Sequence, residues 1–274
     1  MKIIDRLAII IFNLCLLLTS GITPALLLAS SPEYYYEQFE KNGIYASVDE
    51  NGDEQRSIIR YVGGDKTKYA TFSDEQLNLI IHHIIDYLFT DKESFELKMD
   101  EVEIIGEGIC DGVEIFGETA VLHMADVKSL IAFAKWAAII SFLTAASLLI
   151  IFIKRKQIRK HLLKYTAVFY GLLGGFAFLF CLWSLLGAKK LTPTGFLDKL
   201  WGNIHYLLFP FLPEKYANSF LNDTLTQILT LELFMAAVAT IVAVIVSVLA
   251  AWLTIAYILQ KRAKIMLRIM LDKL

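Results

Sequence analysis

Two histidines, His123 and His205, are the side chains in this sequence best suited to catalysis. An imidazole has an unperturbed pKa of about 6.5, so it can take up and return a proton near neutral pH. Asp126 follows His123 by three residues, and this spacing places both side chains on one face of a helix. A carboxylate there can orient the imidazole and raise its basicity. The pair therefore predicts general acid–base chemistry at His123. The alternative is that His123 and Asp126 are polar residues of the membrane interface with no catalytic role.

The other three histidines fit chemistry less well. His82 and His83 lie on an amphipathic segment with no nearby cysteine and no second histidine at i+4, so we expect structural or surface roles. His161 lies in a basic segment and is expected to be solvated or close to lipid headgroups. The sequence has no Ser-centred nucleophile elbow, His-Glu-x-x-His motif or phosphate-binding glycine loop. This argues against hydrolases with that elbow, zinc proteases and nucleotide enzymes.

Four membrane-spanning helices are predicted to position the two candidate histidines. Of the 274 residues, 56% are hydrophobic, against about 45–50% in soluble proteins. The excess falls in four segments long enough to cross a hydrocarbon layer of about 30 Å at 1.5 Å per residue. They are residues 7–30, 129–153, 165–188 and 231–259. We expect the first to be a retained helix, bent at Gly21 and Pro24. A cleaved signal peptide is the alternative.

Charge is divided unevenly along the chain. Residues 31–128 carry 22 acidic and 8 basic side chains, whereas the remainder has a net positive charge. Lys and Arg gather in residues 154–164 and 260–274, which the positive-inside rule places in the cytoplasm. We therefore expect both termini inside and residues 31–128 and 189–230 outside, where the acidic charge of the first excludes a nucleic-acid partner. The stretch Trp201–Phe211 is apolar but too short to span, so it is expected in the outer membrane interface.

The outer domain, residues 31–128, is predicted to be α+β. Ser73 and Gln76 form a capping box, and apolar residues follow at helical spacing, which predicts a helix over residues 74–89. Residues 98–116 alternate weakly and contain three glycines, which is typical of short strands and turns. The expected fold is thus a four-helix membrane bundle with an α+β extracytoplasmic domain inserted between its first two helices.

The predicted elements place the two histidines at similar depth. Residues 118–128 contain no helix breaker and lead straight into the second membrane helix, so His123 is expected just above the outer headgroups. His205 lies in the interfacial part of the other outer loop. Two ionisable groups that meet at one membrane face make a candidate site.

Several stretches of the chain resemble the bacterial lipoprotein intramolecular transacylase family. The most specific is His-Met-Ala-Asp-Val-Lys at 123–128, at the head of the second membrane helix. The others are residues 34–45, the end of the capped helix at 86–88, and the loop 204–210 followed by 222–225. Together they match the order and spacing of almost the whole chain.

The resemblance implies an acyltransferase that moves the sn-2 acyl chain of a diacylglyceryl-cysteine lipoprotein onto the α-amino group of the same cysteine. It implies that His123 or His205 is the base and that the other stabilises the oxyanion or protonates the leaving glyceryl oxygen. Asp126 would orient His123. The implied partners are the lipoprotein substrate and membrane lipid. Ester-to-amide transfer is downhill and needs no ATP, metal or acyl-enzyme, so no cofactor is expected.

Two other functions are alternatives to the transacylase. The first is a membrane-anchored sensor or assembly factor whose acidic outer domain binds a partner, with both candidate histidines merely interfacial. The second is an outward-facing metal site at His82 or His83 with acidic neighbours, for which the spacing supplies too few ligands.

Overall fold

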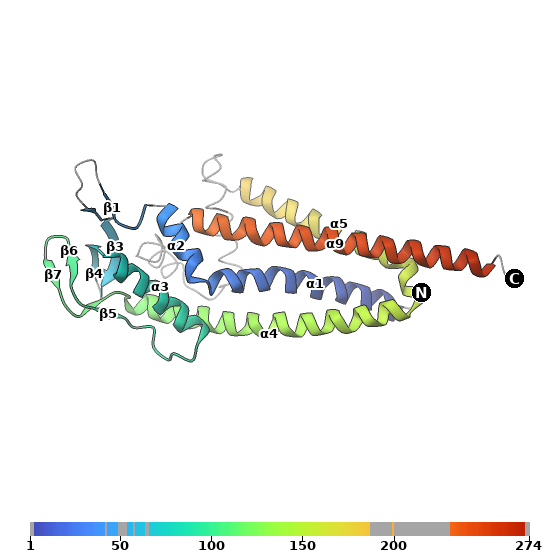
Figure 1. Ribbon diagram of the computed structural model, residues 1–274, viewed down its shortest axis with the longest axis horizontal. Helices are drawn as coiled ribbons and strands as arrows, with labels where there is room; N and C mark the ends of the chain where they lie inside the picture. The colour runs from blue at the N-terminus through green and yellow to red at the C-terminus, as the bar shows by residue number, and fades with distance from the viewer. Residues whose placement is uncertain are drawn as a thin grey trace. The chain divides into compact units, whose positions relative to one another are not determined.

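The computed structural model describes residues 3–41, 43–48, 54–56, 58–63, 66–186, 199 and 231–271. The chain divides into two compact units. We call residues 1–25, 134–207 and 238–274 the membrane unit, and residues 26–133 and 208–237 the polar unit. Figure 1 shows the order of the elements along the chain.

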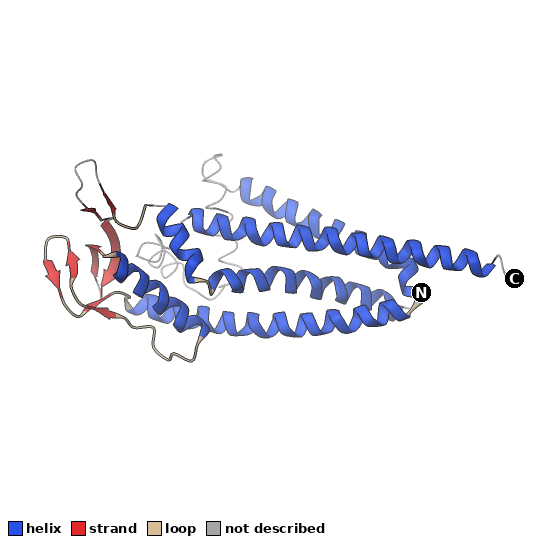
Figure 2. Cartoon of the chain, in the orientation of Figure 1, coloured by secondary structure: helices blue, strands red, loops and turns tan. Residues whose placement is uncertain are grey.

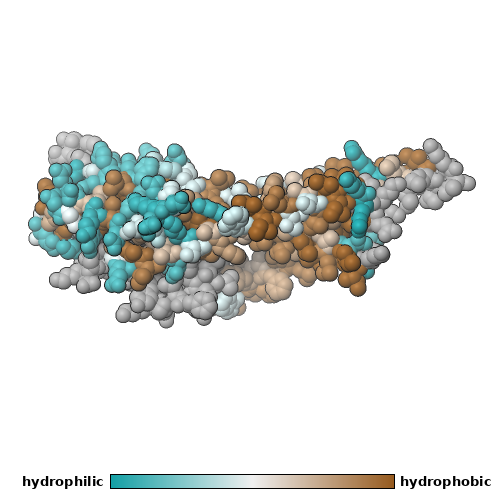
Figure 3. Space-filling model, turned by 90° about the horizontal axis from the view of Figure 1, so that it is seen from below, coloured by the Kyte–Doolittle hydropathy of each residue, from teal (hydrophilic) through white to brown (hydrophobic). Residues whose placement is uncertain are grey.

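Among the residues that the structure describes, four helices are long and apolar enough to cross a membrane, as the hydropathy predicted. They are α1 (Ile3–Ala29), α4 (Glu118–Lys154), α5 (Lys156–Leu186) and α9 (Leu231–Leu271). Large apolar side chains on their outer faces are exposed, among them Trp136 at 66% and Phe176 at 72%. Because lipid tails are themselves apolar, such exposure is the expected state of a membrane helix. The helices of the membrane unit are accordingly brown in Figure 3, and the polar unit is mostly teal.

The ends of these helices differ from the sequence-based expectation in two places. The basic segment 154–164, expected as a connecting loop, is helical except at Arg155. The N–H of Arg155 still donates to the carbonyl of Ile151 at 3.0 Å, as it would within a helix. The segment 260–274, expected as a tail, continues α9 as far as Leu271. Lys and Arg are good helix formers, and a basic residue in the last turn, here Arg268, interacts favourably with the helix dipole. Pro24 lies inside the continuous helix α1.

Three helices of the membrane unit are joined by buried polar side chains. The Nδ2 of Asn13 on α1 donates to the Oγ1 of Thr166 on α5 at 3.2 Å. The indole Nε1 of Trp252 on α9 donates to the Oδ1 of Asn13, also at 3.2 Å. Asn13 and Thr166 have no exposed surface, and Trp252 has 4%. We call these residues the polar triad. It lies in an apolar cluster that includes Phe12, whose ring centroid is 4.5 Å from that of Trp252.

The described part of the polar unit contains the helices α2 (Pro32–Lys41) and α3 (Asp74–Phe89) and eight short strands, all in antiparallel pairs (Figure 2). One sheet has four strands in the order β3-β4-β6-β7, and two further sheets pair β1 with β2 and β5 with β8. The strands are β1 (Ser47–Val48), β2 (Glu54–Gln55), β3 (Ile58–Gly63), β4 (Lys66–Thr71), β5 (Lys98–Met99), β6 (Val102–Ile104), β7 (Gly108–Cys110) and β8 (Val113–Glu114). The predicted α+β composition is present, although the sheets are small.

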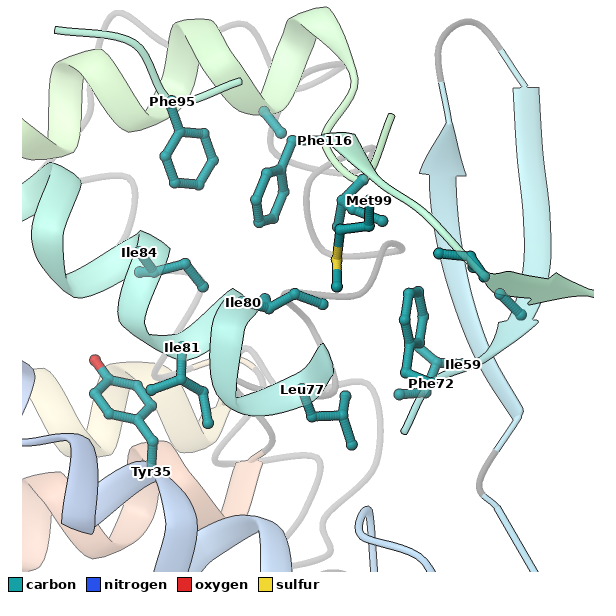
Figure 4. Close-up of a cluster of buried hydrophobic side chains, with 14 of the residues drawn as sticks. Tyr35, Ile59, Phe72, Leu77, Ile80, Ile81, Ile84, Phe95, Met99 and Phe116 are labelled. Atoms are coloured by element: carbon teal, nitrogen blue, oxygen red, sulfur yellow. The ribbon is translucent and has the colours of Figure 1, made fainter. Parts of the chain in front are cut away.

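Helix α3 organises the core of the polar unit. The predicted capping box is present: the Ser73 side chain accepts from the N–H of Gln76, and the Gln76 side chain accepts from the N–H of Ser73. The helix spans the predicted residues, and its buried face packs against aromatic rings of the following connection. Figure 4 shows Ile80 and Ile84 on the side of α3 that faces Phe95 and Phe116, whose rings stack at 4.4 Å.

Candidate active site

His123 lies in the second turn of α4, on the part of that helix that belongs to the polar unit. The helix begins where the N–H groups of Ala120 and Val121 both donate to the carbonyl of Gly117. It then runs unbroken to Lys154, which confirms that residues 118–128 lead directly into the second membrane helix. His123 is therefore held on a rigid element rather than on a loop, a placement that favours accurate positioning of a catalytic side chain.

The His123 side chain is buried, with 5% of its surface exposed. Its neighbours along the helix, Ala120 and Met124, are also buried and belong to the core that contains α3. Val127, one turn further on, is partly buried and packs against the same core. The face of α4 that carries His123 is therefore turned toward the interior of the polar unit. Packing of this kind restricts the orientation of the imidazole, which proton transfer at about 3 Å requires.

Asp126 and His205 are the other two predicted site residues, and the structure describes only Asp126. Asp126 is exposed, and no hydrogen bond or ion pair joins it to His123 among the residues that the structure describes. Its role in orienting His123 stays a prediction. His205 and the surrounding segment Trp201–Phe211 lie outside the described residues. The convergence of the two histidines therefore also stays a prediction.

His83 on α3 is a buried structural histidine, 6% exposed. Lysine has no acceptor, so the Lys92 Nζ donates to His83 Nδ1 at 3.0 Å, and His83 Nε2–H must then donate to the carbonyl of Phe95 at 2.9 Å. Burial lowers the pKa of His83 below 6.5; the Phe95 carbonyl acts in the opposite direction, and the nearby Lys92 ammonium lowers the pKa further. The imidazole is therefore held in its neutral form, and its hydrogen bonds link α3 to the connection that follows it.

His82 faces outward from the same helix. It is exposed, and its Nε2 lies 2.6 Å from the hydroxyl of Tyr36 on α2. The different environments of His82 and His83 follow from helical spacing, because His83 is three residues after the buried Ile80 and so shares its face. Within the described ranges, no three His, Cys, Asp or Glu side chains gather as a metal site.

Lys128 makes contacts that its place in the sequence did not reveal. Its Nζ donates to the backbone carbonyl of Lys92 at 2.6 Å and lies 4.5 Å from the ring centroid of Tyr87 on α3. Sequence patterns within α4 cannot indicate a bond to a residue 36 positions away. The only available signal was that Lys128 ends the His-Met-Ala-Asp-Val-Lys run.

Comparison with known proteins identifies a matching family and solved structures with a similar fold. A family model described as lipoprotein intramolecular transacylase Lit matches residues 7–234. The solved structure of the membrane integral lipoprotein intramolecular transacylase Lit from Bacillus cereus matches with 14% identity and a TM-score of 0.60, over 96% of this chain and 98% of that one.

Two forms of the Bacillus cereus protein in which one histidine is replaced, by arginine or by alanine, match with 15% identity and TM-scores of 0.55 and 0.54. They cover 96% of this chain and 94% and 96% of those chains. At such identities the structural likeness concerns the fold alone. A comparison with curated protein sequences finds no significant match.

Proposed function

The chain belongs to the lipoprotein intramolecular transacylase family and is an acyltransferase, and we propose that it moves the sn-2 acyl chain of a diacylglyceryl-cysteine lipoprotein to the α-amino group of that cysteine. The observation that carries this proposal is the family match over residues 7–234, which includes both His123 and His205. The buried placement of His123 at the head of a membrane helix supports it.

The proposed reaction balances without a cofactor. The free α-amine attacks the carbonyl carbon of the sn-2 ester, a C–N bond forms, and the C–O bond to glycerol breaks. The amine loses a proton and the glyceryl oxygen gains one. The product is an N-acylated, S-monoacylglyceryl cysteine, the lyso-form. An α-amine with a pKa of about 8 is partly protonated at neutral pH, so a positioned base makes it a better nucleophile.

Two imidazoles suit these proton movements. In this proposal His123 or His205 accepts the amine proton, and the other stabilises the oxyanion or returns a proton to the leaving oxygen. Asp126 orients His123 when substrate is bound. General acid–base catalysis contributes about 10²–10⁴-fold. The remainder comes from holding amine and ester within attack distance, which a single substrate molecule carrying both groups favours.

The proposal includes an orientation in the membrane. Residues 31–128 and 189–230 lie outside the cytoplasm, and residues 154–164 and 260–274 lie inside with both termini. The supporting observation is the charge distribution, because Lys and Arg gather at the ends assigned to the cytoplasm. This orientation puts His123 at the outer leaflet, where the lipid-modified cysteine of a lipoprotein resides.

The test is to express the protein in a host that lacks lipoprotein N-acyltransferase and to analyse a reporter lipoprotein by mass spectrometry. The acyl chain only changes its point of attachment, so the intact mass is unchanged and fragmentation must locate the chain. We expect an N-acylated, S-monoacylglyceryl cysteine. A reporter that stays in the diacylglyceryl form while the protein is inserted and stable would contradict the proposed reaction and favour a non-enzymatic sensor or assembly role.

A further inference from the structure

Lys128 joins α4 to the connection after α3 by two directional contacts. Its Nζ donates to the Lys92 carbonyl at 2.6 Å and lies 4.5 Å from the centroid of the Tyr87 ring. A hydrogen bond from an ammonium is about twice as strong as a neutral one, and a cation over an aromatic face is attracted by the ring quadrupole. We call these two contacts the Lys128 clamp.

The acceptor of the clamp is itself held in place. The connection between α3 and β5 is fixed on both sides of Lys92. Before it, the N–H of Thr90 caps α3 by donating to the carbonyl of Asp86 at 2.9 Å. After it, Phe95 is 1% exposed, and its carbonyl accepts from His83. The Lys92 carbonyl is therefore a fixed point of the polar unit, against which α4 can be aligned.

This part of α4 also makes apolar contacts with the core of the polar unit. Ala120 and Met124 lie in the core, with Val127 partly buried beside them. Apolar packing is non-directional, the alanine side chain is a single methyl group, and methionine adapts to irregular gaps. These apolar contacts hold residues 118–133 of α4 within the core of the polar unit but resist rotation of the helix about its own axis weakly.

Geometry connects the clamp to His123. Lys128 is five residues after His123, which places it about 7.5 Å further along the helix axis and about 140° around it. A restraint on that flank opposes rotation of the helix, and rotation is the movement that would turn the imidazole away from its present direction. Displacement of a reacting group by about 1 Å can cost about 10²-fold in rate.

We propose that Lys128 is a positioning residue for the transacylase reaction: through the Lys92 carbonyl and the Tyr87 ring it fixes the rotation of α4 and thereby the direction of the His123 imidazole. The inference rests on the proposed function, because it requires His123 to transfer a proton. Lys128 acts through His123 and does not itself contact the reacting atoms.

The kinetic test uses Lys128→Met, which keeps the apolar stem and removes the donors, and Lys128→Arg, which keeps both a cation and N–H donors. We expect kcat to fall about tenfold to 100-fold in Lys128→Met with KM nearly unchanged, and to recover to within a few-fold of wild type in Lys128→Arg. Lys98→Met is the matched control, because Lys98 lies in the same unit and forms an exposed ion pair with Glu114 at 3.4 Å. It should keep wild-type kinetics.

A second readout does not depend on turnover. Nitroxide labels at Leu79 on α3 and Ala125 on α4, both exposed, report the relation of the two helices by electron–electron distance measurement in the full chain. The three native cysteines, Cys15, Cys110 and Cys181, are replaced by serine beforehand. We expect Lys128→Met to shift or broaden the distance distribution, and Lys128→Arg to retain it.

The outcomes separate this inference from the proposed function. An inactive wild type with a distance distribution that responds to Lys128→Met would refute the proposed reaction and leave only the clamp. Normal kcat in Lys128→Met, while His123→Ala is inactive, would overturn the positioning role alone. An increase in KM without a change in kcat would also overturn it, because Lys128 would then bind substrate. An unchanged distance distribution would show that α4 does not need the clamp.

Discussion

His83 and His123 have similar exposures, 6% and 5%, but their surroundings suit different tasks. Both ring nitrogens of His83 are bonded within the polar unit, to Lys92 and to the Phe95 carbonyl, so its tautomer is fixed. His123 lies near the start of the second membrane helix, which the proposed orientation places at the outer leaflet. At the scale of single residues, burial alone does not separate a structural histidine from a candidate catalytic one.

His123→Ala and His205→Ala are each expected to reduce lyso-form product by about 10²-fold or more at equal expression, because each removes a proton carrier. His82→Ala is the matched control: it also removes an imidazole, but one that is exposed and bonded to Tyr36. It should remain active. Fragmentation mass spectrometry of the reporter measures all three. Wild-type product from His123→Ala would remove that residue from the mechanism.

His83 should make stability depend on pH. Its pKa is lowered in the folded protein, mainly by burial, so the unfolded chain binds the proton at higher pH than the folded one. Between the two pKa values the unfolded state carries more protons. The contribution of His83 is therefore complete above about pH 6.5 and is lost as pH falls from there toward the folded pKa. Thermal unfolding of the detergent-solubilised protein at several pH values should show a smaller decline for His83→Gln than for wild type. Parallel declines would contradict the assignment.

Among the elements, the membrane helices are joined by more than apolar contact. Lipid tails are as apolar as the side chains on these helices, so apolar contact alone does not favour one pairing of helices over another. Polar bonds and close packing therefore determine which helices associate. The polar triad of Asn13, Thr166 and Trp252 links α1, α5 and α9, and each partner comes from a different helix. The arrangement specifies how these three helices pair within the membrane unit.

Asn13→Leu is expected to destabilise the membrane unit by about 0.6–1.7 kcal/mol, since it leaves the Trp252 N–H without its acceptor. Ser147→Ala is the control, because that hydroxyl bonds only within α4, to the Leu143 carbonyl, and is exposed. Unfolding in increasing fractions of denaturing detergent gives both values. In a double-mutant cycle, Trp252→Phe should cost less in the Asn13→Leu protein than in wild type. Strictly additive effects would show that the bond contributes nothing.

For the whole molecule, charge and hydropathy predict the side of the membrane on which each segment lies. The acidic residues 31–128 and the basic segments 154–164 and 260–274 lie at opposite ends of the predicted spans. The helices extend into both basic segments, so the ends predicted to be cytoplasmic are largely helical. Orientation depends on the positions of Lys and Arg and not on local structure, so the helical structure of these segments leaves the proposed topology unchanged.

Single cysteines tested with a membrane-impermeant thiol reagent in intact cells measure that topology. In a background without the native cysteines, Gly64→Cys should be labelled from outside, and Gln157→Cys only after the membrane is permeabilised. Gln157 lies beside the densest group of basic residues, which makes it the more demanding position. Labelling at Gln157 alone in intact cells would invert the topology and place His123 on the cytoplasmic side, away from the proposed substrate.

The sequence by itself determined the features that depend on near neighbours or on simple length. The bounds of α3 follow from the capping box and from residues three or four apart, and the four membrane helices follow from apolar runs long enough to span. The continuity of residues 118–128 with the second span was readable for the same reason: no breaker intervenes. In each case the interaction that determines the structure lies within one turn or one segment, so the sequence is sufficient to predict it.

Only the tertiary structure decided which distant residues meet. Asn13 and Trp252 are 239 positions apart, and Lys128 and the Lys92 carbonyl are 36 apart. No local sequence pattern predicts such a pair, because several polar side chains on a helix face could form a hydrogen bond. The packing of the whole unit determines which of them does so. The burial of His123 likewise depends on which side of α4 meets the core around α3. That choice follows from the combined fit of many apolar side chains, which spacing along a single helix does not contain.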